Sequence, residues 1–298
     1  MSNYLTVNNK KIYYEVHGDD NLPVFLYLHG GPGVGCYDFI EHQGQRLSKF
    51  MKVIAIDQRG VLRSDPIENE ETFGIRDLVK DCESIRKQLG IKKWGIIGHS
   101  FGGYWAVKYQ LNYPEKVTHL LLECPTLDLE SSARSLITGA LQEFEGLGEY
   151  EKVNEYLAAA NIRDTKKVWE KCIEALIDLG EHKDNLYVHG EDKKFFDRLV
   201  ENSGIPQENW ERAANHQQKL YQEGRVFNSL LPQLDSIACP MLLIKGKYDW
   251  VTSNDQLTAF ANGGSNRKIS IFEESGHFPR YEEPENYSSL IKEFIFTN

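Results

Sequence analysis

Short apolar runs alternate with stretches of helical spacing over the first 125 residues of the chain. The segments PVFLYL, MKVIAI and WGII are almost continuously apolar, which is typical of strands covered on both faces of a parallel sheet. From Ile75 to Leu89, apolar residues recur every three or four positions until Gly90, a pattern that predicts a helix. This alternation of strands and helices predicts a doubly wound, mostly parallel α/β sheet.

The pattern changes between residues 126 and 232, where the spacing is mainly helical and no run of the buried-strand type occurs. Strand and helix patterns then resume with PMLLIKGKYD, SNDQLTAFANGG, KISIFEESGH and PENYSSLIKEFIF. We therefore predict a core formed by residues 1–125 and 233–298, with a helical cap at 126–232 inserted after the sixth strand. Because open α/β sheets bind ligands at the carboxyl edge of their strands, we expect the cap to cover a site there.

Composition and charge narrow the classes of partner. The chain has 298 residues, 41% hydrophobic and 26% charged, with a net charge of −10 and no block of five like charges, so nucleic-acid binding is not expected. No apolar run approaches the roughly 18 residues needed to span a bilayer, and the first residues show no signal-peptide pattern. Five scattered cysteines without ligand-like spacing indicate reduced thiols. We expect a cytoplasmic protein with no membrane partner.

A serine stands between glycines in the stretch WGIIGHSFGGYW. Gly98 to Gly102 match the pattern G-x-S-x-G, which is weak alone but here follows an apolar strand and precedes a helical stretch. In that context, glycines permit the sharp turn that exposes a serine hydroxyl, and the helix directs its N-terminal amides at the same point. The alternative is an ordinary turn with a helix-capping serine. We predict that Ser100 is a nucleophile.

A nucleophilic serine needs a base, and the base needs a carboxylate to orient it. His277 lies just past a strand pattern near the end of the chain, where a loop can reach over the sheet edge towards Ser100. Asp249 closes the strand pattern LLIKGKYD and completes the chain order Ser, acid, His. Glu123, one predicted strand earlier, is the main alternative for the acid. His99 adjoins the serine and cannot fold back to act as its base.

The stretch LHGGPGVG follows the apolar run PVFLY. Consecutive glycines after a strand let backbone amides point into a site without obstruction by side chains. We predict that the amides of Gly31 and Phe101 form an oxyanion hole. The alternative interpretation is a turn rich in glycine and proline.

Five motifs appear in order along the chain: HGGPG, DQRGVLRSD, GHSFGG, KGKYD and SGH. Together they resemble the α/β-hydrolase superfamily and, within it, the proline iminopeptidase-like serine hydrolases. The resemblance covers roughly residues 23–125 and 235–298. The two motifs HGGPG and DQRG together indicate the proline iminopeptidase-like subgroup. It implies an aminopeptidase that releases N-terminal proline, or another small residue, from short peptides, with no metal or organic cofactor. Relatives that hydrolyse epoxides or remove halides carry aspartate where this chain has Ser100.

The substrate class depends on how an N-terminal ammonium would be held, because a cation in a covered pocket needs a carboxylate. The resemblance implies a glutamate before an Asn-His pair, but Ala214 stands there in WERAANHQQ. Glu211 and Trp210 are the substitute candidates for substrate binding, and Glu208 is a further carboxylate in the cap. A carboxylesterase or lactonase acting on small uncharged acyl substrates is the alternative. A non-catalytic ligand-binding member of the fold is a remote one.

Overall fold

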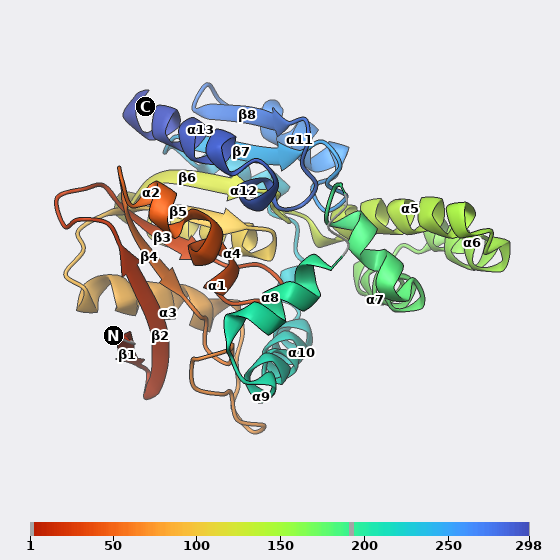
Figure 1. The fold of residues 1–298 in the computed structure, drawn as a ribbon, viewed down its shortest axis with the longest axis horizontal. Helices are drawn as coiled ribbons and strands as arrows, with labels where there is room; N and C mark the ends of the chain where they lie inside the picture. The colour runs from red at the N-terminus through yellow and green to blue at the C-terminus, as the bar shows by residue number, and fades with distance from the viewer. Residues whose placement is uncertain (1–2, 191–193, 298) are drawn as a thin grey trace.

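The computed structural model describes residues 3–190 and 194–297. Within these ranges, eight strands form one sheet in the order β1-β2-β4-β3-β5-β6-β7-β8 (Figure 1). The strands are β1 (Asn3–Val7), β2 (Lys10–His17), β3 (Val24–Leu28), β4 (Lys52–Ile56), β5 (Trp94–His99), β6 (Val117–Glu123), β7 (Met241–Gly246) and β8 (Arg267–Phe272). β2 is antiparallel to β1 and to β4, and the other neighbouring strands are parallel.

Helices cover both faces of the sheet, as the doubly wound pattern predicted. The α-helices are α1 (Tyr37–Phe39), α2 (Gln45–Leu47), α3 (Ile75–Gln88), α4 (Phe101–Asn112), α5 (Leu129–Leu147), α6 (Tyr150–Leu157), α7 (Thr165–Asp178), α8 (Phe195–Ser203), α9 (Gln207–Glu211), α10 (Ala213–Glu223), α11 (Asn254–Ala261), α12 (Pro279–Glu282) and α13 (Pro284–Thr297). Shorter helical turns of other types are η1 (Ile40–Gly44), η2 (Pro114–Lys116), η3 (Ala158–Asn161), η4 (Gly180–Leu186), η5 (Arg225–Phe227) and η6 (Leu231–Ser236).

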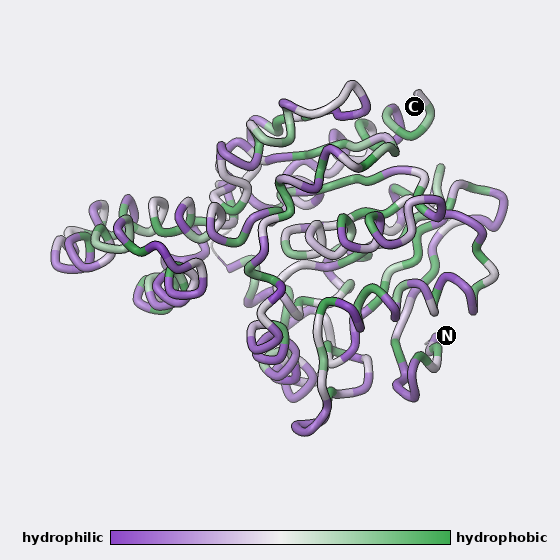
Figure 2. The backbone as a smooth tube through the Cα atoms, turned by 180° about the vertical axis from the view of Figure 1, so that it is seen from behind, coloured by the Kyte–Doolittle hydropathy of each residue, from purple (hydrophilic) through white to green (hydrophobic). Residues whose placement is uncertain are grey.

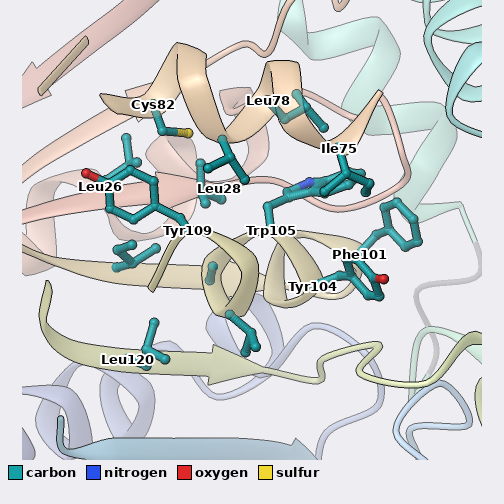
Figure 3. Packing of buried hydrophobic residues seen from close by; sticks show 14 of the residues in the cluster. Leu26, Leu28, Ile75, Leu78, Cys82, Phe101, Tyr104, Trp105, Tyr109 and Leu120 are labelled. Carbon is teal, nitrogen blue, oxygen red and sulfur yellow. The ribbon is translucent and has the colours of Figure 1, made fainter. Parts of the chain in front are cut away.

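The two faces of the sheet carry separate apolar cores because successive side chains of a strand point to opposite sides. In β3, Leu26 and Leu28 belong to the core beneath α3 and α4, whereas Phe25 and Tyr27 belong to the core beneath α13. Figure 3 shows α3 and α4 packing through their side chains onto Leu26 and Leu28. Figure 2 shows hydrophobic residues along the central strands and hydrophilic residues mainly in the outer helices and loops. The continuous apolar strand runs are explained by this double coverage.

Helices α5 to α10 lie between β6 and β7, at the place in the chain where the sequence predicted an insert. α5, α6 and α7 extend to one side of the sheet (Figure 1) and share an apolar core that includes Phe144, Tyr156 and Val168. α8, α9 and α10 lie nearer the loops of the N-terminal half, and Tyr37 donates a hydrogen bond to the carbonyl of Asn202. The domain boundaries at residues 125/126 and 232/233 stay a prediction. In the described part of the chain, no helix has the length and apolarity required to cross a membrane.

Candidate active site

Ser100 occupies the sharp turn between β5 and α4. Its backbone torsions are φ 54° and ψ −124°, in a region that few residues other than glycine adopt. The flanking glycines permit this turn by close approach: a Cβ on Gly98 would lie 2.6 Å from the carbonyl oxygen of Gly102. A Cβ on Gly102 would lie 2.0 Å from the carbonyl oxygen of Leu28. The glycines of the motif are therefore required by packing as well as by the turn.

The backbone of Ser100 is tied to β6 and to the chain that follows it. Its N–H donates to the carbonyl of Glu123 at 2.9 Å, and its carbonyl accepts from the N–H of Thr126 at 3.0 Å. Its hydroxyl makes no capping hydrogen bond to α4, so the alternative of a helix-capping serine is wrong. The side chain is almost buried, at 8% exposure. The hydroxyl is thus held on a fixed backbone, and among the described residues it makes no hydrogen bond.

Asp249 and His277 are hydrogen-bonded to each other at the same edge of the sheet. His277 Nδ1 lies 2.8 Å from Asp249 Oδ1, and both residues are buried. The carboxylate also accepts the N–H groups of Val251 at 2.9 Å and Thr252 at 3.0 Å. Burial opposes the charge on Asp249, but His277, Lys245 and the Val251 amide outweigh it and lower the pKa of that carboxyl. The arrangement keeps an ionised acceptor against the imidazole.

Glu123, the alternative acid, is engaged elsewhere. Its carboxylate accepts the backbone N–H of Arg280 at 3.1 Å and forms an ion pair with the Arg280 guanidinium, 3.1 Å between Oε2 and Nη1. Arg280 also pairs with the buried carboxylate of Asp38. Glu123 is therefore part of a buried charge cluster that anchors α12 to β6, and no hydrogen bond to His277 is found for it among the described residues.

His99 joins the serine turn to the histidine loop. Its Nε2 donates to the carbonyl of His277 at 3.0 Å, and the two ring centroids are 4.7 Å apart. Burial, and then the nearby charge of Arg280, lowers the pKa of His99 well below its ordinary value, which keeps its ring neutral. Between the residues that the structure describes, no hydrogen bond joins the hydroxyl of Ser100 to the ring of His277. Such bonds are often long until a substrate is bound.

The HGGPG loop lies against the serine from the β3 side. A Cβ on Gly30 would lie 2.7 Å from the Cβ of Ser100, and the next residue, Gly31, has φ +111°. Phe101 is the first residue of α4, so its N–H has no partner within the helix. The loop and the helix start thus meet beside Ser100, and the assignment of the Gly31 and Phe101 amides as an oxyanion hole stays a prediction.

The loop carrying His277 is clamped by a carboxylate that sequence reasoning missed. Glu282 accepts the N–H of Gly276 at 2.9 Å and that of Phe278 at 3.2 Å, so it holds the backbone on both sides of the histidine. It also accepts the N–H of His189, at 2.6 Å, from the chain just after η4. Burial raises the pKa of Glu282 to about 7 although these hydrogen bonds oppose the shift.

The cap reaches the site through α10. A Cβ on Gly33 of the HGGPG loop would lie 2.6 Å from the Cβ of Ala213, and Gln217 donates to the carbonyl of Pro32 at 2.5 Å. The side chains of Asn215 and His216 bond main-chain carbonyls, those of Ile67 and Arg59. The Asn-His pair therefore fastens the cap to the core.

Among the described residues, no hydrogen bond, ion pair or ring contact joins the predicted substrate-binding residues Glu211 and Trp210 to Ser100, Asp249 or His277. Glu211 is exposed at the end of α9, and Ala214 is exposed near the start of α10. Trp210 is half-buried, and its indole nitrogen is buried without a hydrogen-bond partner in the described part of the protein. The role of Glu211 and Trp210 in substrate binding stays a prediction.

Ligand atoms of Cys124, Asp249 and His277 lie within 4.8 Å of one another, a spacing at which a metal ion could be held. Burial raises the pKa of the Cys124 thiol well above its ordinary value, and metal ligation requires the thiolate. The carboxylate and the imidazole are bonded to each other rather than turned towards a common point. The donor set therefore fits a Ser-His-Asp arrangement better than a metal site.

Three similarities to known proteins agree with this geometry. Residues 23–284 match the family described as the alpha/beta hydrolase fold. The chain is 26% identical over 313 aligned positions to a proline iminopeptidase of Saccharolobus solfataricus, an alignment covering 98% of this chain and 91% of that enzyme. It is 37% identical over 117 residues to a proline iminopeptidase of Xylella fastidiosa, where only 36% of that enzyme's length is covered.

A solved structure of a proline iminopeptidase-related protein from Thermus thermophilus superposes with a TM-score of 0.76. The superposition covers 99% of this chain and 96% of that one, at 23% sequence identity. At this identity the likeness establishes the shared fold.

Proposed function

The chain belongs to the α/β-hydrolase family, and we propose that it is a serine hydrolase that forms its acyl-enzyme at Ser100. One observation carries the proposal: the 2.8 Å bond between His277 and Asp249 stands at the same sheet edge as a serine whose hydroxyl caps nothing. Family members with aspartate in place of this serine catalyse different reactions, which Ser100 argues against.

In the proposed reaction, Ser100 Oγ attacks the carbonyl carbon of the substrate while His277 Nε2 takes the hydroxyl proton. His277 then gives that proton to the leaving amine or alcohol as its bond to the acyl carbon breaks. Water attacks the acyl-enzyme in the same way and frees the acid. Asp249 holds the imidazole in one tautomer and stabilises its positive charge. The amides of Gly31 and Phe101 would stabilise the oxyanion, each contributing about 3 kcal/mol.

For the substrate, we propose a short peptide from which an N-terminal proline, or another small residue, is released. Support comes from the HGGPG and DQRG motifs and from the similarity to a proline iminopeptidase over 98% of the chain. The segment from position 126 to position 232 contains 20 acidic and 13 basic residues, an excess that favours cationic amines.

A second candidate function, that of a carboxylesterase or lactonase, is favoured by the residue at one position of α10. Ala214 is exposed and carries no carboxylate, and its neighbours Asn215 and His216 are committed to main-chain carbonyls of the core. This part of α10 therefore offers no carboxylate for an N-terminal ammonium. An uncharged acyl substrate would not need one.

Hydrolysis of four substrates by one preparation separates the candidates: prolyl-, alanyl- and N-acetyl-prolyl-nitroanilide, and a short acyl nitrophenyl ester. We expect cleavage of the prolyl substrate and none of its N-acetyl form, because acetylation removes the ammonium. Ester cleavage without aminopeptidase activity would establish the second candidate. Ser100→Ala is the control, and full activity of this variant on any of the four would contradict the serine mechanism.

A further inference from the structure

Lys245 is a buried lysine in the strand that leads to Asp249. It is the fifth residue of β7, and Met241 and Leu243, four and two positions earlier on the same face, belong to the apolar core beneath α4. Lys245 is only 7% exposed. A lysine at such a position must have partners for its ammonium, because burial of an unpaired charge is strongly unfavourable.

The partners of Lys245 all belong to the turn that carries Asp249. Its Nζ donates to the main-chain carbonyl of Asp249 at 2.5 Å and to that of Gly246 at 3.2 Å. The same Nζ lies 3.8 Å from Oδ2 of the Asp249 carboxylate. The other carboxylate oxygen, Oδ1, is the one bonded to His277. One carboxylate thus has a lysine ammonium near one oxygen and the imidazole on the other.

We propose that Lys245 is a positioning residue that holds the Asp249 turn and, through its positive charge, reduces the electrostatic effect of the Asp249 carboxylate on His277. The proposal rests on the proposed hydrolysis at Ser100, in which His277 must be neutral to accept the serine proton. A cation beside Asp249 offsets part of the carboxylate's attraction for the imidazolium.

Several other groups face His277 and are unchanged by substitution of Lys245. Glu282 holds the adjoining amides, and the ring of His99 packs against the imidazole at 4.7 Å. The remaining neighbours are the thiol of Cys124 and the ring of Tyr187 at 5.5 Å. The guanidinium of Arg280 acts on the adjoining ring of His99. Arg280 is a second buried cation, but it is paired with two carboxylates, Asp38 and Glu123. Its charge is therefore already balanced.

The test is a titration of the His277 ring by NMR in the full-length protein, with the signal assigned by comparison with His277→Gln. In Lys245→Met, we expect the titration midpoint of His277 to move up by about one pH unit, because the cation near Asp249 is lost. In the pH profile of kcat/KM, the acid limb should move in the same direction. Lys247→Met is the matched control, because Lys247 is half-exposed and pairs with Glu273 at 3.0 Å. Its midpoint should equal that of the wild type.

A His277 midpoint in Lys245→Met equal to that of the Lys247→Met control would overturn the proposal. If Lys245→Met does not fold, Lys245→Gln and Lys245→Arg decide the matter. Gln keeps a donor for the carbonyls without the charge and should raise the midpoint, whereas Arg keeps the charge and should not. Equal midpoints for these two would also overturn the proposal. Because the titration needs no turnover, failure of the proposed hydrolysis would be seen separately, in the four-substrate assay.

Discussion

Ser100 combines a strained backbone with a hydroxyl that the fold leaves unused. Its φ of 54° is maintained by hydrogen bonds to Glu123 and Thr126 and by glycines that let neighbouring backbone approach closely. Strain of this kind persists only where the surrounding structure enforces it, and it is concentrated at functional sites. The G-x-S-x-G pattern predicted the turn because glycines that stand between a buried strand and a helix ordinarily indicate a sharp turn of the backbone.

Gly102→Ala tests whether the glycines of the turn are required by packing. The new Cβ would lie 2.0 Å from the carbonyl oxygen of Leu28, and backbone cannot move aside cheaply. We expect a loss of about 3 kcal/mol in the free energy of unfolding, measured by urea denaturation. The control is Gly146→Ala in α5, where a Cβ would meet nothing within 4 Å. That change should stabilise by about 0.5–1 kcal/mol, and equal effects of the two would contradict the account.

Two residues at the site gave no usable signal in the sequence. Lys245 stands in a strand pattern, where a charged residue ordinarily indicates an exposed position. Glu282 lies in the stretch RYEEPE, which has the composition of a solvated surface. Their roles depend on contacts with residues outside their own segments or on the exact course of a loop, such as the bond from His189 to Glu282. Pattern and spacing do not contain that information.

At the scale of elements, α12 positions the histidine loop. This four-residue helix begins two residues after His277, and its last residue, Glu282, returns to bond the amides of Gly276 and Phe278. Arg280 anchors the same helix to β6 through Glu123. The sequence predicted a loop that reaches over the sheet edge, and the short helix supplies the fixed geometry of that loop.

Because of Glu282, the free energy of unfolding should depend on pH. The dependence should fall between the pKa of this carboxyl in the unfolded chain and its pKa in the folded protein. Burial raises its pKa from 4.5 to about 7, so the folded protein binds this proton more tightly than the unfolded chain. The stability contributed by this group is complete below about pH 4.5 and is lost as the pH rises to about 7. Glu282→Gln removes the titration and keeps an acceptor oxygen.

We therefore expect Glu282→Gln to gain stability relative to the wild type as the pH rises from 5 to 8, measured by urea unfolding at several pH values. Other titrating groups contribute equally to both proteins and cancel in the difference. A constant difference across this range would show that Glu282 does not titrate there in the folded protein.

At the scale of the whole molecule, sheet order assembles the candidate site. β5, β6, β7 and β8 are neighbours and parallel, so Ser100, Asp249 and His277 reach one edge although the serine and the histidine are 177 positions apart. The order of motifs along the chain was therefore enough to predict the group. The residues that bind the substrate could not be predicted in this way, because motif order does not say how α8, α9 and α10 pack against the loops of the N-terminal half.

The most direct test of the account is the intact mass of the protein after reaction with an organophosphonate, followed by peptide mapping. We expect a single adduct on Ser100, because only a serine activated by His277 and Asp249 attacks phosphorus rapidly. Ser100→Ala should remain unmodified under the same conditions. An unmodified wild-type protein, or an adduct on another residue that persists in Ser100→Ala, would contradict the assignment of this chain as a serine hydrolase.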